Sequence, residues 1–578
     1  MFEIRDEFYL DGKPFRIISG SIHYFRIPHQ YWRDRLCKLK NMGCNTVETY
    51  IPWNFHETKK GEFNFTGDHD VELFIKTATE LGLYIIIRPS PYICAEYEYG
   101  GLPAWLLTDP FVRLRCSYAP YMDAVKEYYA NLMPHLVPYQ SDRGGSIIMM
   151  QIENEYGYYG DDKSYLTELA SIMRENGITV PLVTSDGPMH KSFEAGSCPG
   201  ALQTGNFGSH VIEQFDVMKS KMGSDKPLMC MEFWVGWFDA WGEGHHTSNL
   251  EQNKKDFEDA IKNGSINIYM FEGGTNFGFT SGINYGAVNP DVTSYDYDGV
   301  LTEDGQITSK YLAFKEIIAR YHRIEEIPVP EIKRKAYGRL KIKEKAGLFE
   351  TLSSIAHPMH TVYPVNTENL GQYYGYTLYR TKVADDVSVS SIQTQGARDR
   401  VYAYQNKKFL FTQCASQIDE KFEIAEEEKG PVIDLLIENC GRVNFGPDLE
   451  DQRKGLTKGL RINDYKHFGF DTYLLPLDSE QISRVDYSRG YTQGNPAFYK
   501  FEFEADEECD TFLDFAGFSK GCAFINGINL GRFWDIGPQR RLYIPAPYIK
   551  KGVNEIVLFE TEGKCADSIY LSDKSCLS

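Results

Sequence analysis

Up to about residue 325, short apolar runs rich in β-branched and aromatic residues alternate with stretches of helical periodicity. Eight such runs occupy residues 15–23, 45–51, 83–89, 146–153, 180–186, 201–207, 227–233 and 266–274. In the intervening stretches 31–42, 71–81, 121–136, 165–174 and 250–262, apolar residues recur every three or four positions, as in a helix packed on a sheet. Eight strand–helix units in about 320 residues predict a (β/α)8 barrel, also called a TIM barrel.

The competing architecture for alternating strands and helices is a doubly wound open sheet. That fold places a Gly-rich phosphate loop after its first strand. Here the end of the first run leads into SIHYFRIP (21–28), which contains no GxGxxG pattern. The residues therefore favour the barrel and leave the open sheet as the alternative.

The pattern changes at the Pro-punctuated segment IPVPEIKR (327–334). Beyond it, short runs alternate apolar and polar residues between turn residues, which is typical of β-sandwiches. The expected fold class is therefore α/β, a barrel followed by two all-β domains of jelly-roll or β-sandwich type. We expect the barrel over 1–325, a linker with strands that join the last domain over 326–374, a first sandwich over 375–480 and a second over 481–578.

The charge balance bears on the partners of the chain. With 81 acidic against 61 basic residues, the net charge of −20 repels phosphate backbones and anionic lipid. No run approaches the roughly 18–20 apolar residues of a membrane span, and MFEIRDEFYL (1–10) lacks the basic and apolar regions of a secretory signal. We therefore expect a cytoplasmic protein with neither a nucleic-acid nor a membrane partner.

The twelve cysteines are scattered and lack the CxxC spacing of a zinc site. We expect reduced thiols, as is usual in the cytoplasm, and neither a metal nor a cofactor. The adjacent His245 and His246 are read as a solvated loop, because neighbouring side chains diverge in an extended chain. The β-rich second half can support a homodimer.

Carboxylates, amides and indoles follow the predicted strands, where a barrel places its catalytic groups. The strand ends carry Glu48 and Tyr50, Arg88 followed by Glu96 and Glu98, the run Gln151 to Glu155, Glu232 with Trp234 and Trp237, and Glu272. Carboxylates and amides bind sugar hydroxyls, and aromatic rings pack on the apolar side of a pyranose. Such a rim is what a sugar site needs.

Glu155 after the fourth strand and Glu232 on the seventh face each other across such a barrel. Glycoside hydrolysis needs one carboxylic acid to protonate the leaving oxygen and one carboxylate to stabilise or attack the anomeric carbon. A single Glu at a strand end is more often a structural acceptor, but here Asn154 stands beside the first Glu. Glu153 is interpreted as a buried structural acceptor, because it would point away from its neighbour in an extended strand.

The segment GGSIIMMQIENEYG (144–157) resembles the signature of glycoside hydrolase family 35, the β-galactosidases, with Ser146 where the family usually has Pro. Further stretches that resemble the family are ETYIPWNFHE (48–57), RPSPYICAEYEYGGLPAWL (88–106), MEFWVGWFDAWG (231–242), MFEGGTNFGFTSG (270–282), TSYDYDGVLTEDG (293–305), GRVNFG (441–446) and INGINLGRFWDIGPQRRLYIPAPYIK (525–550). The resemblance spans nearly the whole chain and looks like the bacterial intracellular branch, with a galactose-binding-like last domain.

The resemblance implies an exo-acting, retaining β-galactosidase acting on β-galactoside oligosaccharides. It implies that Glu155 is the acid/base and Glu232 the nucleophile. It also implies that Asn154 hydrogen-bonds the 2-hydroxyl group of the sugar. The family's galactose-contact positions fall on Tyr50, Ala95, Glu96 and Tyr297. The nucleophile is expected to receive donors from Arg88 and from the hydroxyl of Tyr297 or Tyr269.

The residues themselves, rather than the family resemblance, suggest which side chains contact the leaving group. Trp234 and Trp237 lie just beyond the nucleophile, where they could wall a subsite that favours β-1,3 linkages. Phe445, in a turn-like Val-Asn-Phe-Gly, is the β-domain residue expected to reach the barrel mouth, whereas Trp534 is expected to pack domains together. The alternatives are an exo-hydrolase of another terminal sugar such as glucosamine, and an inactive sugar-binding protein.

Overall fold

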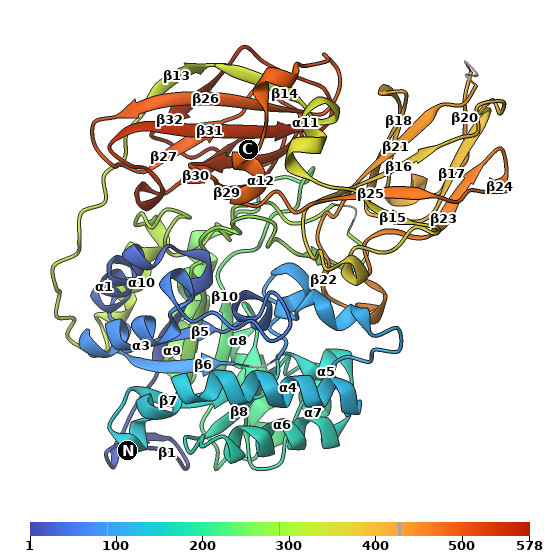
Figure 1. The fold of residues 1–578 in the computed structure, drawn as a ribbon. Helices are drawn as coiled ribbons and strands as arrows, with labels where there is room; N and C mark the ends of the chain where they lie inside the picture. Colours follow the sequence, from blue (N-terminus) through green and yellow to red (C-terminus); the bar gives the residue numbers. More distant parts are fainter. Residues whose placement is uncertain (90, 288, 426–428) are drawn as a thin grey trace.

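The computed structural model describes residues 1–578 except 90, 288 and 426–428. Within the described residues, eight parallel strands close into a barrel (Figure 1). These are β4 (Ile18–Ile22), β5 (Thr46–Tyr50), β6 (Tyr84–Arg88), β7 (Ile147–Gln151), β8 (Leu182–Asp186), β9 (Leu202–Asn206), β10 (Met229–Trp234) and β11 (Ser265–Glu272). They pair in chain order, and β11 closes the barrel against β4. The predicted (β/α)8 barrel is confirmed, and the doubly wound sheet is excluded.

Helices surround the barrel. The longer ones are α1 (Trp32–Met42), α3 (Val71–Glu80), α4 (Ala119–Leu132), α6 (Lys163–Glu175), α8 (Val211–Met222), α9 (Leu250–Asn263) and α10 (Ser309–Ile318). The short helices α2 (Trp53–His56), α5 (Tyr156–Tyr159) and α7 (Ser192–Ala195) follow the carboxyl ends of barrel strands. Gly43 ends α1 with a φ of 107°, and a Cβ there would meet Ile318 at 2.6 Å, so the turn requires glycine. No helix in the described part of the chain is long and apolar enough to cross a membrane.

An N-terminal meander covers one end of the barrel. It consists of β1 (Phe2–Ile4), β2 (Phe8–Leu10) and β3 (Lys13–Pro14). Phe2 and Phe8 pack against Ile86, Met149 and Met231 of the barrel interior. The meander lies on the side of the barrel away from the β-domains (Figure 1). The carboxyl ends of the strands therefore face the β-domains.

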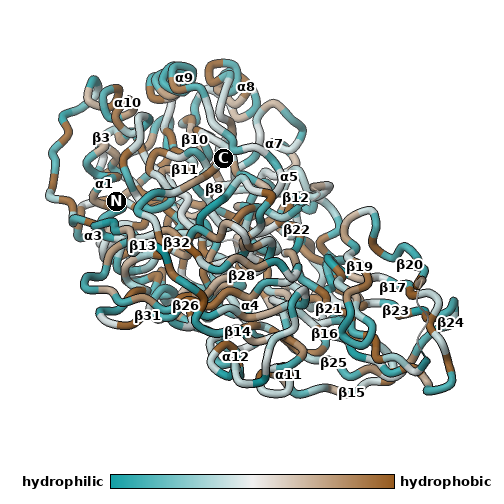
Figure 2. Tube along the Cα trace, turned by 90° about the horizontal axis from the view of Figure 1, so that it is seen from above, coloured by the Kyte–Doolittle hydropathy of each residue, from teal (hydrophilic) through white to brown (hydrophobic). Residues whose placement is uncertain are grey.

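The first β-domain is a sandwich of two antiparallel sheets. One sheet contains, in spatial order, β15 (Met359–Thr361), β25 (Phe470–Leu475), β16 (Tyr376–Lys382), β21 (Val432–Glu438), β18 (Arg400–Gln405) and β19 (Lys408–Cys414). The other contains β20 (Phe422–Glu423), β17 (Ser391–Arg398), β23 (Gly455–Ile462) and β24 (Tyr465–Lys466). Its core includes Ile392, Val401, Leu435 and Leu460. This domain projects to one side, with β24 at its far end (Figures 1 and 2).

The second β-domain is assembled from two distant parts of the chain. Its five-stranded sheet contains β14 (Glu344–Gly347), β26 (Ala497–Ala505), β31 (Gly552–Glu560), β28 (Lys520–Ile525) and β29 (Ile528–Trp534), and its four-stranded sheet contains β13 (Gly338–Lys341), β32 (Ser568–Ser572), β27 (Thr511–Asp514) and β30 (Arg541–Ile544). Thus β13 and β14, which precede the first β-domain in sequence, complete the second. The fold class predicted from the sequence, a barrel followed by all-β domains, is confirmed.

Two further helices, α11 (Leu348–Ile355) and α12 (Ser479–Ser483), join the β-domains. Leu352 and Ile482 pack in a core shared with Tyr376 of the first β-domain and Phe559 of the second. Trp534 packs with Trp241 and Val292 of the barrel, which joins the second β-domain to it. These apolar contacts tie the three domains together.

The first β-domain also docks on the barrel mouth. Its strand β22 (Val443–Phe445) pairs in parallel with β12 (Ile283–Asn284) of a barrel loop. The neighbouring Arg442 is fully buried and donates to Glu98 of the barrel and to Glu368 of the linker. Because a buried guanidinium requires such partners, Arg442 fixes the place of β22 at the mouth.

Candidate active site

One cavity of about 250 Å³ at the barrel mouth collects all the residues that the sequence proposes for the site. They are Tyr50, Ala95, Glu96, Asn154, Glu155, Glu232, Trp234, Trp237, Tyr297 and Phe445. The ends of β5 and β10 and the segment after β7 supply the polar centre, and β22 supplies Phe445. Residues far apart in sequence thus share one enclosed space.

Three donors converge on the carboxylate of Glu232. Tyr50 Oη lies 2.6 Å and Arg88 Nη2 2.7 Å from its Oε1, and Trp234 Nε1 donates to Oε2 at 3.1 Å. Tyr50 pairs with Arg88 across β5 and β6, and the guanidinium carbon lies 3.9 Å from the Tyr50 ring centroid. Such donors favour the charged form of a carboxyl group.

The expectation about these donors is correct for Arg88 and wrong for the hydroxyl. The tyrosine that donates to Glu232 is Tyr50, because the register of β5 and β6 brings its ring against Arg88. The hydroxyl of Tyr269 lies 3.2 Å from that of Tyr295 instead. Tyr297 lines the cavity wall, with its ring against that of Tyr269.

Glu155 lines the same cavity and is partly buried. Asn206 Nδ2 donates to its Oε1 at 2.9 Å, and the Ser185 hydroxyl donates to the Asn206 amide oxygen. Burial, followed by the negative charge of Glu232, raises the pKa of Glu155 to about 7, although the Asn206 hydrogen bond and Arg88 act in the other direction. This carboxyl group can therefore hold or release a proton near neutral pH.

The backbone after β7 turns sharply rather than continuing as a strand. The strand ends at Gln151, and Glu153 and Glu155 have φ values of 58° and 46°, a left-handed conformation that is rare outside glycine. Asn154 and Glu155 line the cavity, whereas Glu153 accepts two hydrogen bonds of 2.9 Å from Arg115. Glu153 is thus a structural acceptor, but the reason we expected, alternation along an extended strand, is wrong.

Asn154 is held by the same groups that hold Glu232. Its Oδ1 accepts hydrogen bonds from Arg88 Nη2 at 2.5 Å and Gln151 Nε2 at 3.2 Å, and Tyr50 Oη lies 3.0 Å away. With the oxygen engaged in this way, the amide N–H groups are the donors that Asn154 can offer to a ligand.

The loop after β6 presents Ala95 and Glu96 to the cavity. Cys94, Ala95 and Glu96 have consecutive φ values of 58°, 54° and 48°. Arg26 supports the loop by donating to the Ala95 carbonyl at 2.6 Å, and the Tyr295 hydroxyl donates to the Glu96 carboxyl group. Burial raises the pKa of Glu96 to about 7, which the Tyr295 hydrogen bond opposes. The loop therefore offers both a carboxyl group and backbone groups to a hydroxylated ligand.

Aromatic rings form the outer wall of the cavity. The rings of Trp234 and Trp237 lie edge to face with centroids 5.9 Å apart, and Trp237 is 43% exposed. Phe445 is 37% exposed and faces Tyr158, with ring centroids 6.4 Å apart. The wall is thus built from β10 and the segment that follows it, from α5 and from the first β-domain.

Sequence reasoning missed four lining residues, Cys94, Tyr158, Phe238 and Asn284, and also Asn206, which donates to Glu155. Asn206 is the last residue of β9, so the strand-end rule applied to the sixth run could have found it. Asn284 enters the site through the pairing of β12 with β22, for which the sequence carries no local signal.

Other carboxylates near the strand ends have structural partners. Arg35 Nε donates to Glu272 at 2.8 Å, and Arg442 binds Glu98. The Ser21 hydroxyl donates to Glu48. These groups belong to the packing around the site.

The expectation for His245 and His246 is wrong in its geometry. Their Nδ1 atoms lie 2.7 Å and 3.0 Å from the two carboxylate oxygens of Asp239. The two side chains converge because the chain folds around that carboxylate. Among the described residues, no group of three or more His, Cys, Asp or Glu side chains is arranged to hold a metal ion.

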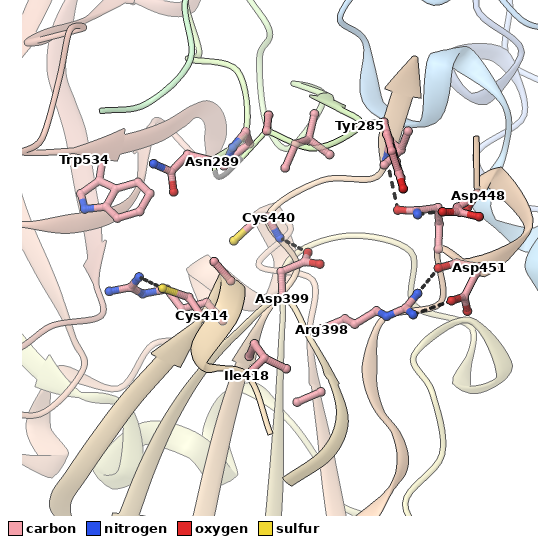
Figure 3. A pocket seen from close by; sticks show the side chains of 18 residues that line it. Tyr285, Asn289, Arg398, Asp399, Cys414, Ile418, Cys440, Asp448, Asp451 and Trp534 are labelled. Atoms are coloured by element: carbon pink, nitrogen blue, oxygen red, sulfur yellow. Dashed lines mark hydrogen bonds and ion pairs between the residues drawn. The ribbon is translucent and has the colours of Figure 1, made fainter. Parts of the chain in front are cut away.

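A larger cavity of about 400 Å³ lies where the barrel and the two β-domains meet (Figure 3). Four of its charged groups have partners within the protein: Arg398 pairs with Asp451 at 2.6 Å, and Asp399 accepts from the Cys440 backbone at 2.9 Å. Arg400 donates to the Cys414 sulfur at 3.3 Å and pairs with Glu562. We assign this cavity to domain packing and the smaller one to chemistry.

Comparison with known proteins is consistent with this geometry. Residues 7–321 match the family model of glycosyl hydrolases family 35, residues 364–477 that of the first all-beta domain of beta-galactosidase, and residues 496–554 that of its galactose-binding domain. The human beta-galactosidase-1-like protein 2 is 39% identical, covering 96% of this chain and 88% of that protein. The beta-galactosidase of Bos taurus is 38% identical, covering 97% of this chain and 90% of that protein.

Proposed function

The chain belongs to glycosyl hydrolases family 35 and is a glycoside hydrolase, and we propose that it is an exo-acting, retaining β-galactosidase that releases terminal non-reducing β-galactose from oligosaccharides. The observation that carries the proposal is a pair of carboxyl groups in unlike settings. Glu155 has a pKa raised to about 7, and Glu232 receives three donors that favour its carboxylate. Retaining glycosidases divide the roles of acid and nucleophile between two such groups.

In the first step, the Glu232 carboxylate attacks the anomeric carbon of the terminal galactose. The glycosidic bond breaks as Glu155 gives its proton to the departing oxygen, and the sugar becomes an ester of Glu232. Glu155 can act as the acid because its pKa of about 7 leaves it protonated in part at neutral pH. The leaving sugar departs as a neutral alcohol.

In the second step, the Glu155 carboxylate takes a proton from a water molecule as that water attacks the anomeric carbon. The ester bond to Glu232 breaks, and its carboxylate is restored. Two inversions at the same carbon leave the product in the β configuration. A single group with a pKa near 7 serves both as the acid and as the base.

The surrounding residues supply the recognition. The Asn154 amide N–H groups bind the sugar 2-hydroxyl, a contact that strengthens in the transition state. Tyr50, Ala95, Glu96 and Tyr297 contact the remaining galactose hydroxyls and ring. The cavity of about 250 Å³ is smaller than the roughly 300–1,000 Å³ of sites for drug-sized ligands, which supports binding of one terminal sugar.

The leaving sugar is assigned to the aromatic wall. Trp234, Trp237 and Phe445 stand at the outer side of the cavity, and two of these rings are more than one-third exposed. Rings in this position can stack on the first leaving sugar. We propose that the indole platform gives a preference for β-1,3 linkages.

The test compares the release of nitrophenol from aryl β-galactoside, β-glucoside and β-glucosaminide. We expect β-galactoside to be preferred, and NMR of the first product should show β-galactose. Preferential cleavage of the glucosaminide would assign another sugar, and α-galactose as the first product would contradict the retaining mechanism. Defined disaccharides would then test the linkage preference.

We also propose that the enzyme works in a reducing compartment, as in the bacterial intracellular branch of the family. All twelve cysteines are free thiols in the structure. Eight of them are buried: Cys37, Cys44, Cys94, Cys198, Cys230, Cys440, Cys509 and Cys522. Fractionation of the source cells with antibody detection tests this location.

A further inference from the structure

A second cavity of about 530 Å³ adjoins the catalytic one. Asn154, Glu155, Tyr158 and Phe445 line both cavities. Beyond this shared wall, the second cavity is lined by Tyr92, Arg115, Tyr159, Tyr285, Gly446 and Pro447. The proton donor Glu155 therefore stands between two hollows.

The chemistry of the proposed reaction indicates that the second cavity lies on the leaving-group side of the catalytic one. Galactose occupies the catalytic cavity with Tyr50 and Glu96, which do not line the second one. Glu155 protonates the oxygen that joins galactose to the leaving group, so the leaving sugars extend from the Glu155 side. The second cavity thus begins where a chain of leaving sugars would continue.

The walls of this cavity suit a sugar ring. Tyr158 is 44% exposed and Tyr285 is 56% exposed, and with Phe445 they surround one hollow from three separate segments. Large rings with this much exposure are seldom grouped on a surface without a ligand or partner. Tyrosine combines a flat apolar face for stacking with a hydroxyl for hydrogen bonding.

The charge of the cavity points to an uncharged ligand. Its charged wall residue other than Glu155 is Arg115, whose Nε and Nη2 each lie 2.9 Å from a carboxylate oxygen of Glu153. The same guanidinium lies 3.7 Å from the Tyr92 ring centroid and 4.4 Å from that of Tyr159. A cation neutralised and enclosed in this way does not attract a phosphate or carboxylate.

Tyr285 belongs to the second cavity and not to the catalytic one. Its backbone N–H donates to the Phe445 carbonyl at 2.9 Å. Gly446 has a φ of 119°, and a Cβ there would lie 2.4 Å from the Tyr285 Cβ, so glycine lets the two segments meet. Tyr285 is thus the residue through which the second cavity can be altered separately.

We propose that this cavity is a second leaving-group subsite that binds an uncharged sugar residue. The preferred substrates are then β-galactosides of three or more sugars, in which the third ring stacks against Tyr285. This inference rests on the proposed β-galactosidase function.

The experiment compares a β-galactosyl disaccharide with the trisaccharide that extends the same disaccharide by one neutral sugar at its reducing end. The measured quantity is the ratio of their kcat/KM values for galactose release. Wild-type enzyme should favour the trisaccharide by roughly three- to ten-fold, as expected for one stacked ring. Tyr285→Ala should bring the ratio close to one, mainly through KM, and Tyr285→Phe should keep most of the preference.

Tyr465→Ala is the matched control, because Tyr465 is 79% exposed on β24 at the far end of the first β-domain. Its ratio should equal that of the wild type. Equal kcat/KM values for the two substrates in wild-type enzyme, or a preference that survives Tyr285→Ala, would overturn the second subsite and leave the β-galactosidase assignment intact. Failure to release galactose from either substrate and from an aryl galactoside would overturn both proposals.

Discussion

The hydrogen bond from Asn206 lowers the pKa of Glu155. Its amide nitrogen donates to Glu155 at 2.9 Å, and the Ser185 hydroxyl orients that amide by binding its oxygen. Burial and the Glu232 charge raise the pKa of Glu155 to about 7, whereas the hydrogen bond from Asn206 stabilises the carboxylate and lowers the pKa. We predict that Asn206→Ala raises the pKa of Glu155 further and extends activity to higher pH.

The size of the shift follows from the contact that is lost. A hydrogen bond to a charged group contributes about 1.5–3 kcal/mol. Water that enters beside the partly buried Glu155 offsets part of this, which leaves about 1.4 kcal/mol, or about one pKa unit. The acid form is the active one in the first step, so activity is present below the pKa and is lost as pH rises through it. At pH 8 the protonated fraction should increase from about 0.1 to about 0.5.

The assay is kcat/KM against pH for an aryl galactoside with a poor leaving group, because this parameter reports the free enzyme. The fall of kcat/KM at high pH should shift to higher pH by about one pH unit in Asn206→Ala. In Ser185→Ala it should shift in the same direction by less. Dinitrophenyl galactoside is the control substrate, since its departure needs no acid and its profile should lack this fall in every variant. A fall that stays at the wild-type pH or moves down in Asn206→Ala would refute this role.

Three further predictions concern the catalytic and leaving-group residues. Glu232→Ala should abolish turnover, and azide should restore it with formation of α-galactosyl azide, because the small anion replaces the missing nucleophile; a β product detected by NMR would contradict that role. Glu155→Gln should slow hydrolysis of poor leaving groups by about 10²–10⁴-fold and spare dinitrophenyl galactoside, whereas equal losses would place Glu155 elsewhere in the mechanism. Phe445→Ala should raise KM for a disaccharide about ten-fold, as for one lost ring contact, with a much smaller change for an aryl galactoside; similar changes for both would remove Phe445 from the leaving-group side.

The barrel, and the grouping of the candidate catalytic residues at its mouth, could be predicted from the sequence because both follow from local patterns. Parallel strands buried on both faces are continuous apolar runs, such as the one that became β6. Once eight such runs were placed, the rule that catalytic groups stand at strand ends brought Glu155 and Glu232 to one mouth. Asn206 obeys the same rule and was within reach of the same reasoning.

The remaining features depend on contacts that are distant in sequence. The left-handed turns at Glu153 and Glu155 are unfavourable for non-glycine residues and persist because tertiary contacts such as the Arg115 pair hold them. The register of β5 and β6, rather than any sequence motif, determines that Tyr50 is the tyrosine that donates to Glu232. Likewise, Tyr285 enters the second cavity through a two-strand pairing between domains.

The contact between Arg442 and Glu98 also governs the order in which the enzyme can be completed during its synthesis. These two residues are 344 positions apart in the chain. At roughly 5–20 residues per second, the ribosome adds Arg442 on the order of 20–70 s after it has added Glu98. During this interval the barrel strands already exist, but Glu98 has no countercharge and the Phe445 side of the catalytic mouth is absent. The nascent barrel therefore acquires its complete mouth only when the first β-domain has been translated and has docked.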